Sequence, residues 1–521
     1  MFLRSVALLL TAALPVAVLS VRDDHAPAPV SPETRLVSAV AVPGTTEVDT
    51  VRAAALVRRM SLPEVAGQVI VAGYPGTGSP AALVGRLHLG GVVPVAVNIT
   101  SPAQIRAVND SVRRVVAGRG YPAFIGVDQE GGLVARVHAP ATAFPTFMST
   151  GAGRRTDLTR SAAAASAAEM ATLGFTSVLG PDADVTRGPS DPVIGTRSAG
   201  GHPAAVARQV VAADEGVRDV GMVGALKHFP GHGSLTSDSH LSLPVQRRSL
   251  AQLMATDLVP FWAAIAGGAN VVMTGHIDVR AVDPGVPASV SRKVTTGLLR
   301  QRLGFRGLVV TDGLGMLGVA RRYPSSVVGA RALWAGADVV LMPPDPSAAR
   351  DGIVRAVRRG TLSRERLDEA ATRMIALLLH QQPLLQPRAL GTGRAASTRL
   401  SAAALTSVSG RCHGRLVGRA VHVAGPTSVA ATFRRIAAAN GLPSTRRGTT
   451  VVLARTRPVR GAVVVALDRP NLLGHSRAPV RLAAYGETPE AMTAVVRFLL
   501  GRAAAPGRLP VPVAGAPRGG C

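Results

Sequence analysis

The sequence has 521 residues and is 47% hydrophobic, which is enough to bury a large core and to form two or more domains. Basic residues outnumber acidic residues 58 to 31, but they are scattered and form no long basic run or basic and aromatic stripe. This distribution argues against nucleic-acid binding and favours solubility together with attraction to a polyanionic surface such as a cell wall.

The N-terminus has the pattern of an export signal. Arg4 supplies a positive charge, and residues 5–19 form an apolar stretch of the length found in signal peptides. The stretch is short for a spanning helix, which needs about 20 apolar residues. We therefore expect a signal peptide at residues 1–20, with an uncleaved anchor as the alternative, and a linker at 21–47. The protein is expected to be secreted or associated with the cell wall or cell surface, with no integral membrane domain beyond such an anchor.

Eight short apolar runs rich in β-branched residues alternate with helical stretches between residues 48 and 385. Such runs are typical of parallel strands that helices cover. Eight units in this length predict an α/β fold of the (β/α)8 barrel type, with an open doubly wound sheet as the alternative. The runs are residues 68–74, 91–97, 123–128, 176–185, 224–229, 269–278, 307–315 and 337–343.

A second, smaller α/β domain is expected at residues 406–521, after a connector at 386–405. Apolar runs at residues 420–425, 450–455 and 462–468 alternate there with helical stretches at 427–440 and 488–500. The end of the chain, from residue 506, is a tail of low structural content. The two cysteines, Cys412 and Cys521, lie in this part and would be able to form one disulfide in an oxidising compartment.

Polar and acidic residues gather where several predicted barrel strands end. A carboxylate that closes an apolar strand is costly to bury unless it is paired or functional. Active sites of (β/α)8 barrels lie at the carboxyl ends of the strands, so the repeated pattern indicates an active site there. The residues concerned are Asp128, Asp182, Asp184, Lys227, His228, His276, Asp278 and Asp312.

The segment 227–240 holds the densest set of polar residues, with three histidines, one lysine and one aspartate. Asp238 and His240 lie two residues apart, so the carboxylate would be able to orient the imidazole and fix its tautomer. Lys227 is one of only two lysines in an arginine-rich chain, which suggests that a compact ammonium is needed at this position. Lys227 beside His228 would repel a metal cation, and we expect no metal and no cofactor.

Three motifs now carry a resemblance to a known family. The segment 227–240, the segment 311–316 and the Asp128-Gln-Glu-Gly-Gly segment resemble glycoside hydrolase family 3, in its β-N-acetylhexosaminidase branch. The resemblance covers about residues 50–385, and residues 484–492 resemble the C-terminal domain of two-domain members more weakly. It implies a retaining hydrolase that removes terminal β-linked N-acetylglucosamine from glycans of the cell wall or related material.

The resemblance also implies roles for individual residues. Asp312 matches the nucleophile, His240 the general acid/base and Asp238 the partner that orients His240. A histidine suits the acid/base role because its ordinary pKa of about 6.5 lies near the working pH. The residues matching those that hold the sugar are Asp128, Arg136, Arg197, Lys227 and His228.

Three alternatives remain at this point: a β-glucosidase or xylosidase of the same fold, a glycoside phosphorylase, and a non-catalytic wall-binding barrel. The first group resembles this chain at Asp312 but takes its acid/base from the C-terminal domain. The sequence departs from the family pattern at Gly313, Leu133 and Ala199, which affects the edges of the sugar site but removes no proposed catalytic group. Aromatic residues make up only 3% of the chain, which favours a short glycan or a terminal sugar over a long glycan.

Overall fold

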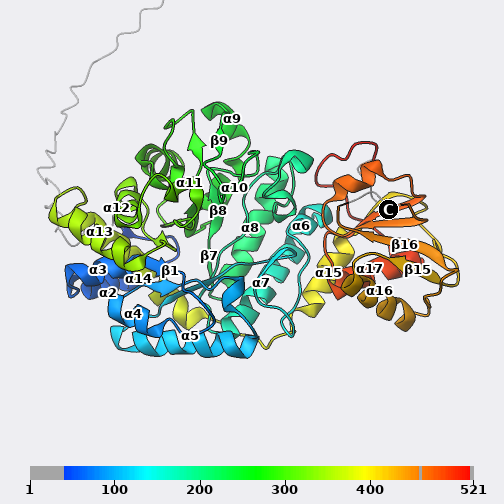
Figure 1. The fold of residues 1–521 in the computed structure, drawn as a ribbon, viewed down its shortest axis with the longest axis horizontal. Helices are drawn as coiled ribbons and strands as arrows, with labels where there is room; N and C mark the ends of the chain where they lie inside the picture. Colours follow the sequence, from blue (N-terminus) through cyan, green and yellow to red (C-terminus); the bar gives the residue numbers. More distant parts are fainter. Residues whose placement is uncertain (1–39, 457–459, 517–520) are drawn as a thin grey trace, which may run out of the picture.

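A computed structural model describes residues 40–456, 460–516 and 521. The predicted signal peptide or anchor at residues 1–20, and most of the predicted linker, lie outside these residues. The described chain forms a large barrel domain followed by a smaller α/β domain (Figure 1). Among the described residues, no helix is both long enough and apolar enough to cross a membrane.

The barrel has eight parallel strand positions, and each overlaps one of the eight predicted runs. The strands are β1 (Ile70–Ala72), β2 (Gly91–Val92), β3 (Phe124–Val127), β6 (Ser177–Val178), β7 (Val223–Gly224) continuing into β8 (Leu226–Phe229), β10 (Val271–Thr274), β12 (Leu308–Thr311) and β13 (Val340–Leu341).

Hydrogen bonds between these strands close a ring. One sheet has the order β13-β1-β2-β3-β6-β7, and another has the order β12-β10-β8. The chain links β7 to β8 directly, and a parallel bridge between Val310 and Val339 joins β12 to the start of the last strand. The predicted barrel is therefore confirmed, and the open doubly wound sheet is excluded.

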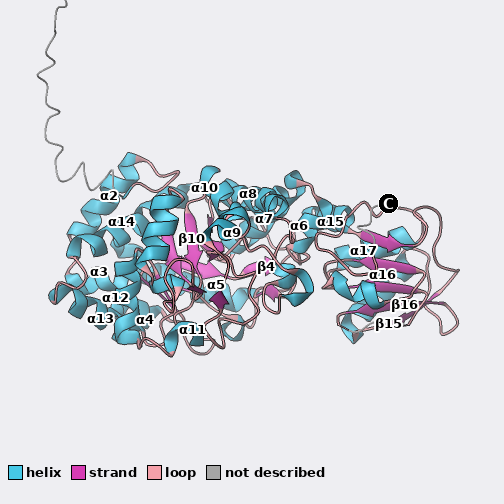
Figure 2. Ribbon diagram, turned by 90° about the horizontal axis from the view of Figure 1, so that it is seen from above, coloured by secondary structure: helices cyan, strands magenta, loops and turns pink. Residues whose placement is uncertain are grey.

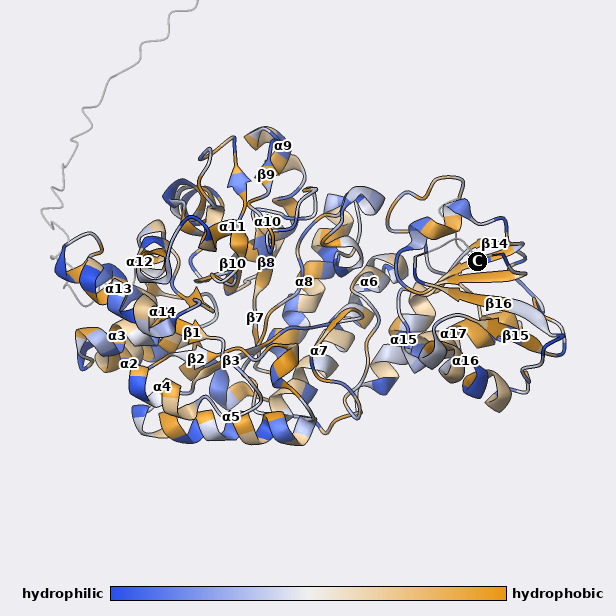
Figure 3. Ribbon diagram, viewed as in Figure 1, coloured by the Kyte–Doolittle hydropathy of each residue, from blue (hydrophilic) through white to orange (hydrophobic). Residues whose placement is uncertain are grey.

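Helices surround the strands of the barrel (Figure 2). In α5, the hydroxyl of Ser101 caps the first turn by accepting a hydrogen bond from the N–H of Gln104 at 3.1 Å, while Ile105, Val112 and Val116 are buried. Figure 3 shows the resulting alternation of hydrophilic and hydrophobic residues along this helix. The main barrel helices are α2 (Glu47–Arg58), α3 (Leu62–Gln68), α4 (Ala81–Leu87), α5 (Pro102–Val116), α7 (Thr156–Thr172), α8 (Pro203–Asp219), α10 (Val259–Ala266), η6 (Lys293–Arg302), α12 (Ser325–Ala335), α13 (Pro346–Arg358) and α14 (Arg364–Gln381).

Shorter elements shape the loops of the barrel. Two pairs of short strands lie outside the ring: β4 (Gln129–Gly131) with β5 (Val134–Ala135), and β9 (Val245–Gln246) with β11 (Asp278–Val279). The short helices are η1 (Ala96–Asn98), η2 (Ala117–Arg119), α6 (Met148–Gly153), η3 (Gly188–Ser190), η4 (Gly195–Arg197), α9 (Leu250–Ala255), η5 (Ala288–Val290), α11 (Leu317–Ala320) and η7 (Gln382–Leu384).

The C-terminal domain contains a five-stranded sheet with its own apolar core. The strand order is β14-β18-β17-β16-β15, and only the β14 pairing is antiparallel. A disulfide between Cys412 and Cys521 joins the end of the chain to this domain. The elements are β14 (Thr406–Ser409), β15 (Val421–Ala424), α16 (Thr427–Ala439), β16 (Thr449–Ala454), β17 (Val463–Ala466), η8 (Pro470–His475), β18 (Val480–Ala483) and α17 (Pro489–Leu499).

Two features of this region were not expected from the sequence. The connector at 386–405 contains a helix, α15 (Arg394–Ala404), which packs against α6, α7 and α17. Ala396, Leu400 and Ala404 recur every four residues and form its buried face, but the short apolar side chains gave a weak signal. Strands β14 and β18 were also missed, because polar residues interrupt their apolar pattern: three of the four residues in β14 are polar, and β18 contains Arg481.

A buried ion cluster stabilises the barrel where the last strand begins. The Asp338 carboxylate contacts three guanidinium groups, at 2.5 Å from Arg300, 2.8 Å from Arg366 and 3.1 Å from Arg373. It also accepts a hydrogen bond from the N–H of Val309 at 2.9 Å. Burial raises the pKa of Asp338, but the three arginines and this hydrogen bond outweigh that effect and hold the pKa below its ordinary value.

Replacing Asp338 with asparagine should destabilise the barrel strongly, because three arginines would lose the carboxylate that neutralises them. We expect Asp338→Asn to lower the free energy of unfolding by roughly 3 kcal/mol or more, measured by denaturant unfolding near pH 7. The difference from wild type should shrink as the pH falls through the lowered pKa of Asp338, since the native carboxylate is then protonated as well. Asp110→Asn, at a more exposed acid on α5, is the control. Equal effects of the two substitutions would contradict this account.

Candidate active site

The eight residues assigned to the site from the sequence lie on loops and strand ends at one end of the barrel. The carboxyl ends of parallel strands meet at the same end of a barrel, so residues far apart in the sequence converge. Asp128 follows β3, Lys227 and His228 lie in β8, and Asp312 follows β12. The others lie on loops: Arg136 follows β5, Arg197 ends η4, and Asp238 and His240 lie between β8 and β9.

Lys227 is the cation at the centre of the site. Its side chain is only 3% exposed, and its ammonium lies 2.8 Å from Asp128 Oδ1 and 2.6 Å from Glu130 Oε1. Burial lowers the pKa of Lys227, but the two carboxylates raise it by more, so the pKa lies above its ordinary value. Lys227 therefore remains charged throughout the neutral range.

Arg197 is the second cation of the network, with a side chain 18% exposed, and Glu130 joins it to Lys227. The guanidinium binds Glu130 through two parallel hydrogen bonds of 2.8 and 2.9 Å. Burial raises the pKa of Glu130, but Arg197 and Lys227 lower it further, to well below its ordinary value. Arg197 Nη2 also lies 3.5 Å from His228 Nε2. The arrangement fixes the planar guanidinium between a carboxylate and an imidazole.

Asp184 orients His228 and the start of the following loop. Its Oδ2 lies 2.7 Å from His228 Nδ1, and its Oδ1 accepts the N–H of His232 at 2.5 Å. Burial raises the pKa of Asp184, but the charges of His228 and His232 and these hydrogen bonds lower it below its ordinary value. The ionised carboxylate therefore holds a proton on Nδ1 of His228 and leaves Nε2 directed toward Arg197.

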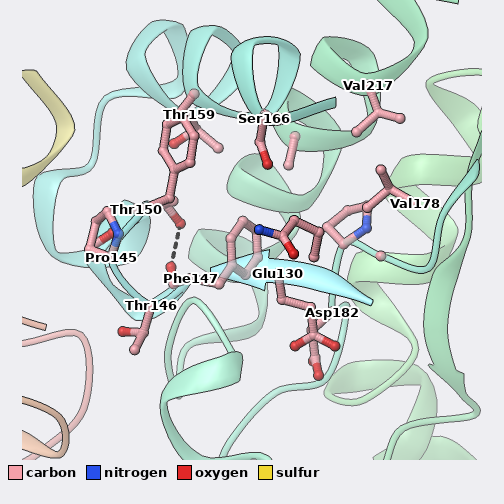
Figure 4. A pocket seen from close by; sticks show the side chains of 18 of the residues that line it. Glu130, Pro145, Thr146, Phe147, Thr150, Thr159, Ser166, Val178, Asp182 and Val217 are labelled. Carbon is pink, nitrogen blue, oxygen red and sulfur yellow. Dashed lines mark hydrogen bonds between the residues drawn. The ribbon is translucent and has the colours of Figure 1, made fainter. Parts of the chain in front are cut away.

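Asp182 differs from its neighbours in the network because it favours its neutral form. Burial, reinforced by the charge of Asp184, raises the pKa of Asp182 well above its ordinary value. A cavity of about 80 Å³ lies beside Asp182 and Glu130 and is lined mostly by apolar side chains such as Val178 and Val217 (Figure 4). Asp182 Oδ1 accepts a hydrogen bond from the N–H of Asp184 at 3.0 Å, whereas its buried Oδ2 has no hydrogen-bond partner among the described residues.

The same region contains a group with the geometry to hold a cation. Ligand atoms of Asp182, Asp184 and His228 lie within 4.8 Å of one another. However, Arg197 Nη2 lies 3.6 Å from Asp182 Oδ2, and His228 Nδ1 is engaged by Asp184. Two of the candidate ligand atoms are thus already in contact with other side chains.

Asp312 lies at the end of β12 with its carboxylate held by the next peptide. Its Oδ1 accepts a hydrogen bond of 2.7 Å from the N–H of Gly313. His276 supports this turn, since its Nε2 lies 2.9 Å from the Gly313 carbonyl oxygen. Burial raises the pKa of Asp312, but His228, His276, the Gly313 hydrogen bond and Lys227 together lower it below its ordinary value. Asp312 is therefore ionised at neutral pH.

His240 and Asp238 form a hydrogen-bonded pair at the surface of the site. His240 Nδ1 lies 2.7 Å from Asp238 Oδ1, and the imidazole is 63% exposed. The loop is joined to the segment after Asp312, because Leu317 N–H donates to the His240 carbonyl at 3.3 Å and Gly318 N–H donates to the Ser239 carbonyl at 3.0 Å. The pair therefore lies beside the segment that follows Asp312, and Asp238 holds the imidazole through Nδ1.

Arg136 lies at the edge of the network and is partly exposed. Its Nη2 is 3.8 Å from Asp128 Oδ2, and its backbone N–H donates to Gln129 Oε1 at 2.9 Å. Leu133 forms the exposed turn between β4 and β5. The hairpin thus places Glu130 and Arg136 on the same side of the network as Asp128.

Several residues of the network had no assigned role from the sequence. Glu130 lies inside the Asp128-Gln-Glu-Gly-Gly motif, Asp184 and His276 are strand-end residues, and His232 lies in the segment 227–240. The polar residues at the strand ends and in the motifs pointed to these positions, but the sequence did not predict which side chains contact one another. The same pattern selected Asp278, which does not join the network: it pairs with Arg280 at 3.0 Å and accepts a hydrogen bond from the N–H of Gly285 at 2.8 Å.

The loops at this end of the barrel thus carry an ionised carboxylate held by the next peptide, a carboxylate–imidazole pair on an adjoining loop, and a network of paired charged side chains. The family model of the glycosyl hydrolase family 3 N terminal domain matches residues 64–377. The chain therefore belongs to glycosyl hydrolase family 3, and the resemblance seen in the sequence is confirmed.

The chain is similar to several named β-hexosaminidases within that family. Beta-hexosaminidase A of Pseudoalteromonas piscicida is 34% identical over 279 residues, which are 50% of this chain and 47% of that protein. Beta-hexosaminidase LpqI of Mycobacterium tuberculosis is 33% identical over 320 residues, covering 60% of this chain and 81% of that protein. The structure of a family 3 β-N-acetylglucosaminidase from Paenibacillus superposes with a TM-score of 0.79 at 28% identity, covering 87% of this chain and 99% of that chain.

The geometry around Lys227 predicts that arginine cannot replace it. A planar guanidinium would have to fit a buried space shaped for an ammonium between Asp128 and Glu130, beside the guanidinium of Arg197. We expect Lys227→Arg to lower kcat/KM for aryl β-glycosides by about 100-fold, measured by steady-state kinetics.

The second lysine of the chain provides a matched control for this prediction. Lys293 is 68% exposed and pairs with Asp283 at 3.2 Å, so Lys293→Arg should retain wild-type kinetics. If Lys227→Arg also retains wild-type kcat/KM, the site needs only a positive charge there and the account of Lys227 is wrong.

Proposed function

We propose that the protein is an exported, retaining β-N-acetylhexosaminidase that removes terminal β-linked N-acetylglucosamine from cell-wall-derived or related glycans. The observation that carries the proposal is the Asp238–His240 pair, on a loop hydrogen-bonded to the segment that follows Asp312. It supplies a proton-transfer group where most glycosidases use a second carboxyl group.

Asp312 is the nucleophile in this proposal. Its carboxylate is ionised, and the peptide of Gly313 holds it in one orientation. It would attack the anomeric carbon on one face of the sugar and form a glycosyl ester, while the leaving oxygen departs from the other face. The neighbouring cations stabilise the carboxylate before attack, and again when water releases it from the ester.

His240 is the general acid and then the general base. Asp238 holds Nδ1–H, so Nε2 is the atom that transfers the proton. In the first step, Nε2–H protonates the leaving oxygen, and in the second, neutral Nε2 accepts a proton from the attacking water. The imidazole thus returns to its starting protonation state when the second step is complete.

The buried network is proposed to hold the sugar hydroxyls. The partners of these side chains hold them in place before substrate arrives. Little conformational freedom of the side chains is therefore lost when the sugar binds. Charged donors and acceptors form stronger hydrogen bonds to hydroxyls than neutral ones do. The residues proposed to contact the sugar are Asp128, Arg136, Arg197, Lys227 and His228.

The leaving group would lie beside His240, where two leucines are exposed. Leu241 follows His240 directly and is 65% exposed, and Leu317 is joined to His240 through its N–H. These side chains offer an aliphatic surface to the sugar that departs. Together with the low aromatic content, this favours a short leaving group over a long glycan.

Export and wall association are part of the proposal. The Cys412–Cys521 disulfide suits an oxidising compartment, and the apolar stretch near the N-terminus has the pattern of a signal peptide. The net charge of +27 would favour contact with an anionic cell-wall surface.

A panel of aryl β-glycosides tests the proposed substrate and reaction. We expect kcat/KM for the N-acetylglucosaminide to exceed that for the glucoside and the xyloside by about 100-fold or more, because polar groups built to bind one sugar are left unpaired by another. Free N-acetylglucosamine should be the product with and without added phosphate. Asp312→Ala, the matched control, should lose activity by about 10³-fold or more.

Each contrary outcome of the panel identifies a different error. A preference for the glucoside or xyloside would refute the substrate, and N-acetylglucosamine 1-phosphate as product would refute hydrolysis. Absence of turnover by folded wild-type protein would favour a non-catalytic wall-binding barrel.

Removal of His240 should affect poor leaving groups far more than good ones. For His240→Ala, an activated aryl N-acetylglucosaminide should still form the glycosyl ester, because its leaving group needs little protonation. Deglycosylation should then be slow, so a burst of phenol precedes steady state, and added azide should restore turnover because it needs no general base. Asp238→Asn should show a milder effect. Uniform slowing of all substrates, with no burst and no azide rescue, would show that His240 is not the acid/base.

A further inference from the structure

The loop of residues 186–201 delivers Arg197 to the site and is organised internally by Asp191. The buried Asp191 carboxylate accepts hydrogen bonds from the hydroxyl of Thr186 at 2.7 Å, from Ile194 N–H at 2.9 Å and from Gly195 N–H at 3.1 Å. These hydrogen bonds hold the loop backbone in place just before Arg197.

Two adjacent residues of the C-terminal domain, Asp468 and Arg469, contact this loop from outside the barrel. Asp468 Oδ1 accepts a hydrogen bond from the hydroxyl of Thr196, the residue next to Arg197. Arg469 Nη1 donates to the Asp191 carbonyl at 2.8 Å. Its guanidinium also lies directly over Gly195, where a Cβ atom, if glycine carried one, would be 2.7 Å from Nη2. The C-terminal domain therefore contacts the loop at the two residues that precede Arg197.

The chain segment after α17 contacts the loop near both of its ends. The Pro510 carbonyl accepts the N–H of Gly201 at 3.1 Å, and Val511 packs near Gly188. The disulfide Cys412–Cys521 and the bond from Cys521 N–H to the Ala505 carbonyl, at 3.0 Å, fasten this segment to its own domain. Both ends of the loop thus rest on the C-terminal domain.

We infer that the C-terminal domain positions Arg197 for sugar binding by clamping the loop 186–201, with Asp468 and Arg469 as positioning residues. The inference rests on the proposed function, in which Arg197 contacts the sugar. The two parallel hydrogen bonds from Arg197 to Glu130 require the guanidinium and the carboxylate to lie in one plane. A small shift of Thr196, the residue before Arg197, would therefore misalign these bonds. The clamp acts through Thr196 and Gly195, and neither Asp468 nor Arg469 needs to touch substrate.

Substitutions of Asp468 that differ only in the acceptor oxygen test the clamp in the full-length protein. Asp468→Asn keeps an oxygen that can accept from Thr196, and we expect its kinetics to stay within about twofold of wild type. Asp468→Leu removes the acceptor, and we expect KM for the aryl N-acetylglucosaminide to rise about tenfold with a smaller change in kcat. Arg469→Ala should act similarly. Thr196→Val should add no further loss to Asp468→Leu, because both remove the same bond.

A control substitution separates the clamp from general stability of the C-terminal domain. Arg481 donates to the Leu473 carbonyl at 3.0 Å and to Ser409 at 2.9 Å, both within its own domain. Arg481→Ala should lower the Tm of the domain but leave KM unchanged below that temperature. A rise in KM for Arg481→Ala equal to that for Asp468→Leu would show a purely structural role and overturn the clamp.

Hydrogen exchange gives a readout that does not depend on activity. Amide protection of residues 186–201 should fall in Asp468→Leu and Arg469→Ala but not in Asp468→Asn or Arg481→Ala. Failure of the wild-type protein to hydrolyse the substrate would refute the proposed function while leaving this measurement valid. Wild-type KM together with unchanged protection in both clamp variants would refute the clamp.

Discussion

The site depends on one constraint, the pairing of the buried Glu130 carboxylate with two cations, Lys227 and Arg197. Removing any of the three charges would raise the free energy of the folded protein strongly. The Glu130 side chain is only 4% exposed, so removal of either cation would leave it with an incompletely compensated charge. The three side chains come from a hairpin, a barrel strand and a long loop. Their mutual pairing therefore fixes the relative positions of three separate segments of the barrel.

This network also sets the charge states around the reacting groups. Burial raises the pKa of Asp312, but His228, His276, the Gly313 N–H and Lys227 lower it by more, whereas burial and the charge of Asp184 raise the pKa of Asp182. His240 is outside this network, and its side chain is largely exposed. In the proposed mechanism His240 transfers the proton, while the buried network holds the sugar in place.

The sequence predicted the barrel and the candidate site residues, but not the contacts between those residues or three elements in or near the C-terminal domain. Each barrel strand overlaps a predicted apolar run. Seven of the eight proposed site residues lie in the three motifs or directly beside them, whereas Arg197 lies on the separate loop after β6, and strand ends bring these segments together in a closed barrel. Pairings such as Arg197 with Glu130 were not accessible, since they join residues 67 positions apart whose approach depends on loop geometry. The helix α15 and strands β14 and β18 were missed because their stability comes from contacts across the domain rather than from a strong local pattern.

The central claim is that Asp312 forms a covalent bond to the sugar, and isolation of that bond tests it most directly. Wild-type protein would be incubated with a fluorinated N-acetylglucosaminyl substrate whose ester hydrolyses slowly, and then measured by intact-protein and peptide mass spectrometry. The account predicts a stoichiometric mass increase of one sugar residue, located on the peptide that contains Asp312 and absent from Asp312→Ala. Substrate turnover with no adduct under these conditions, or an adduct on another carboxylate, would contradict it.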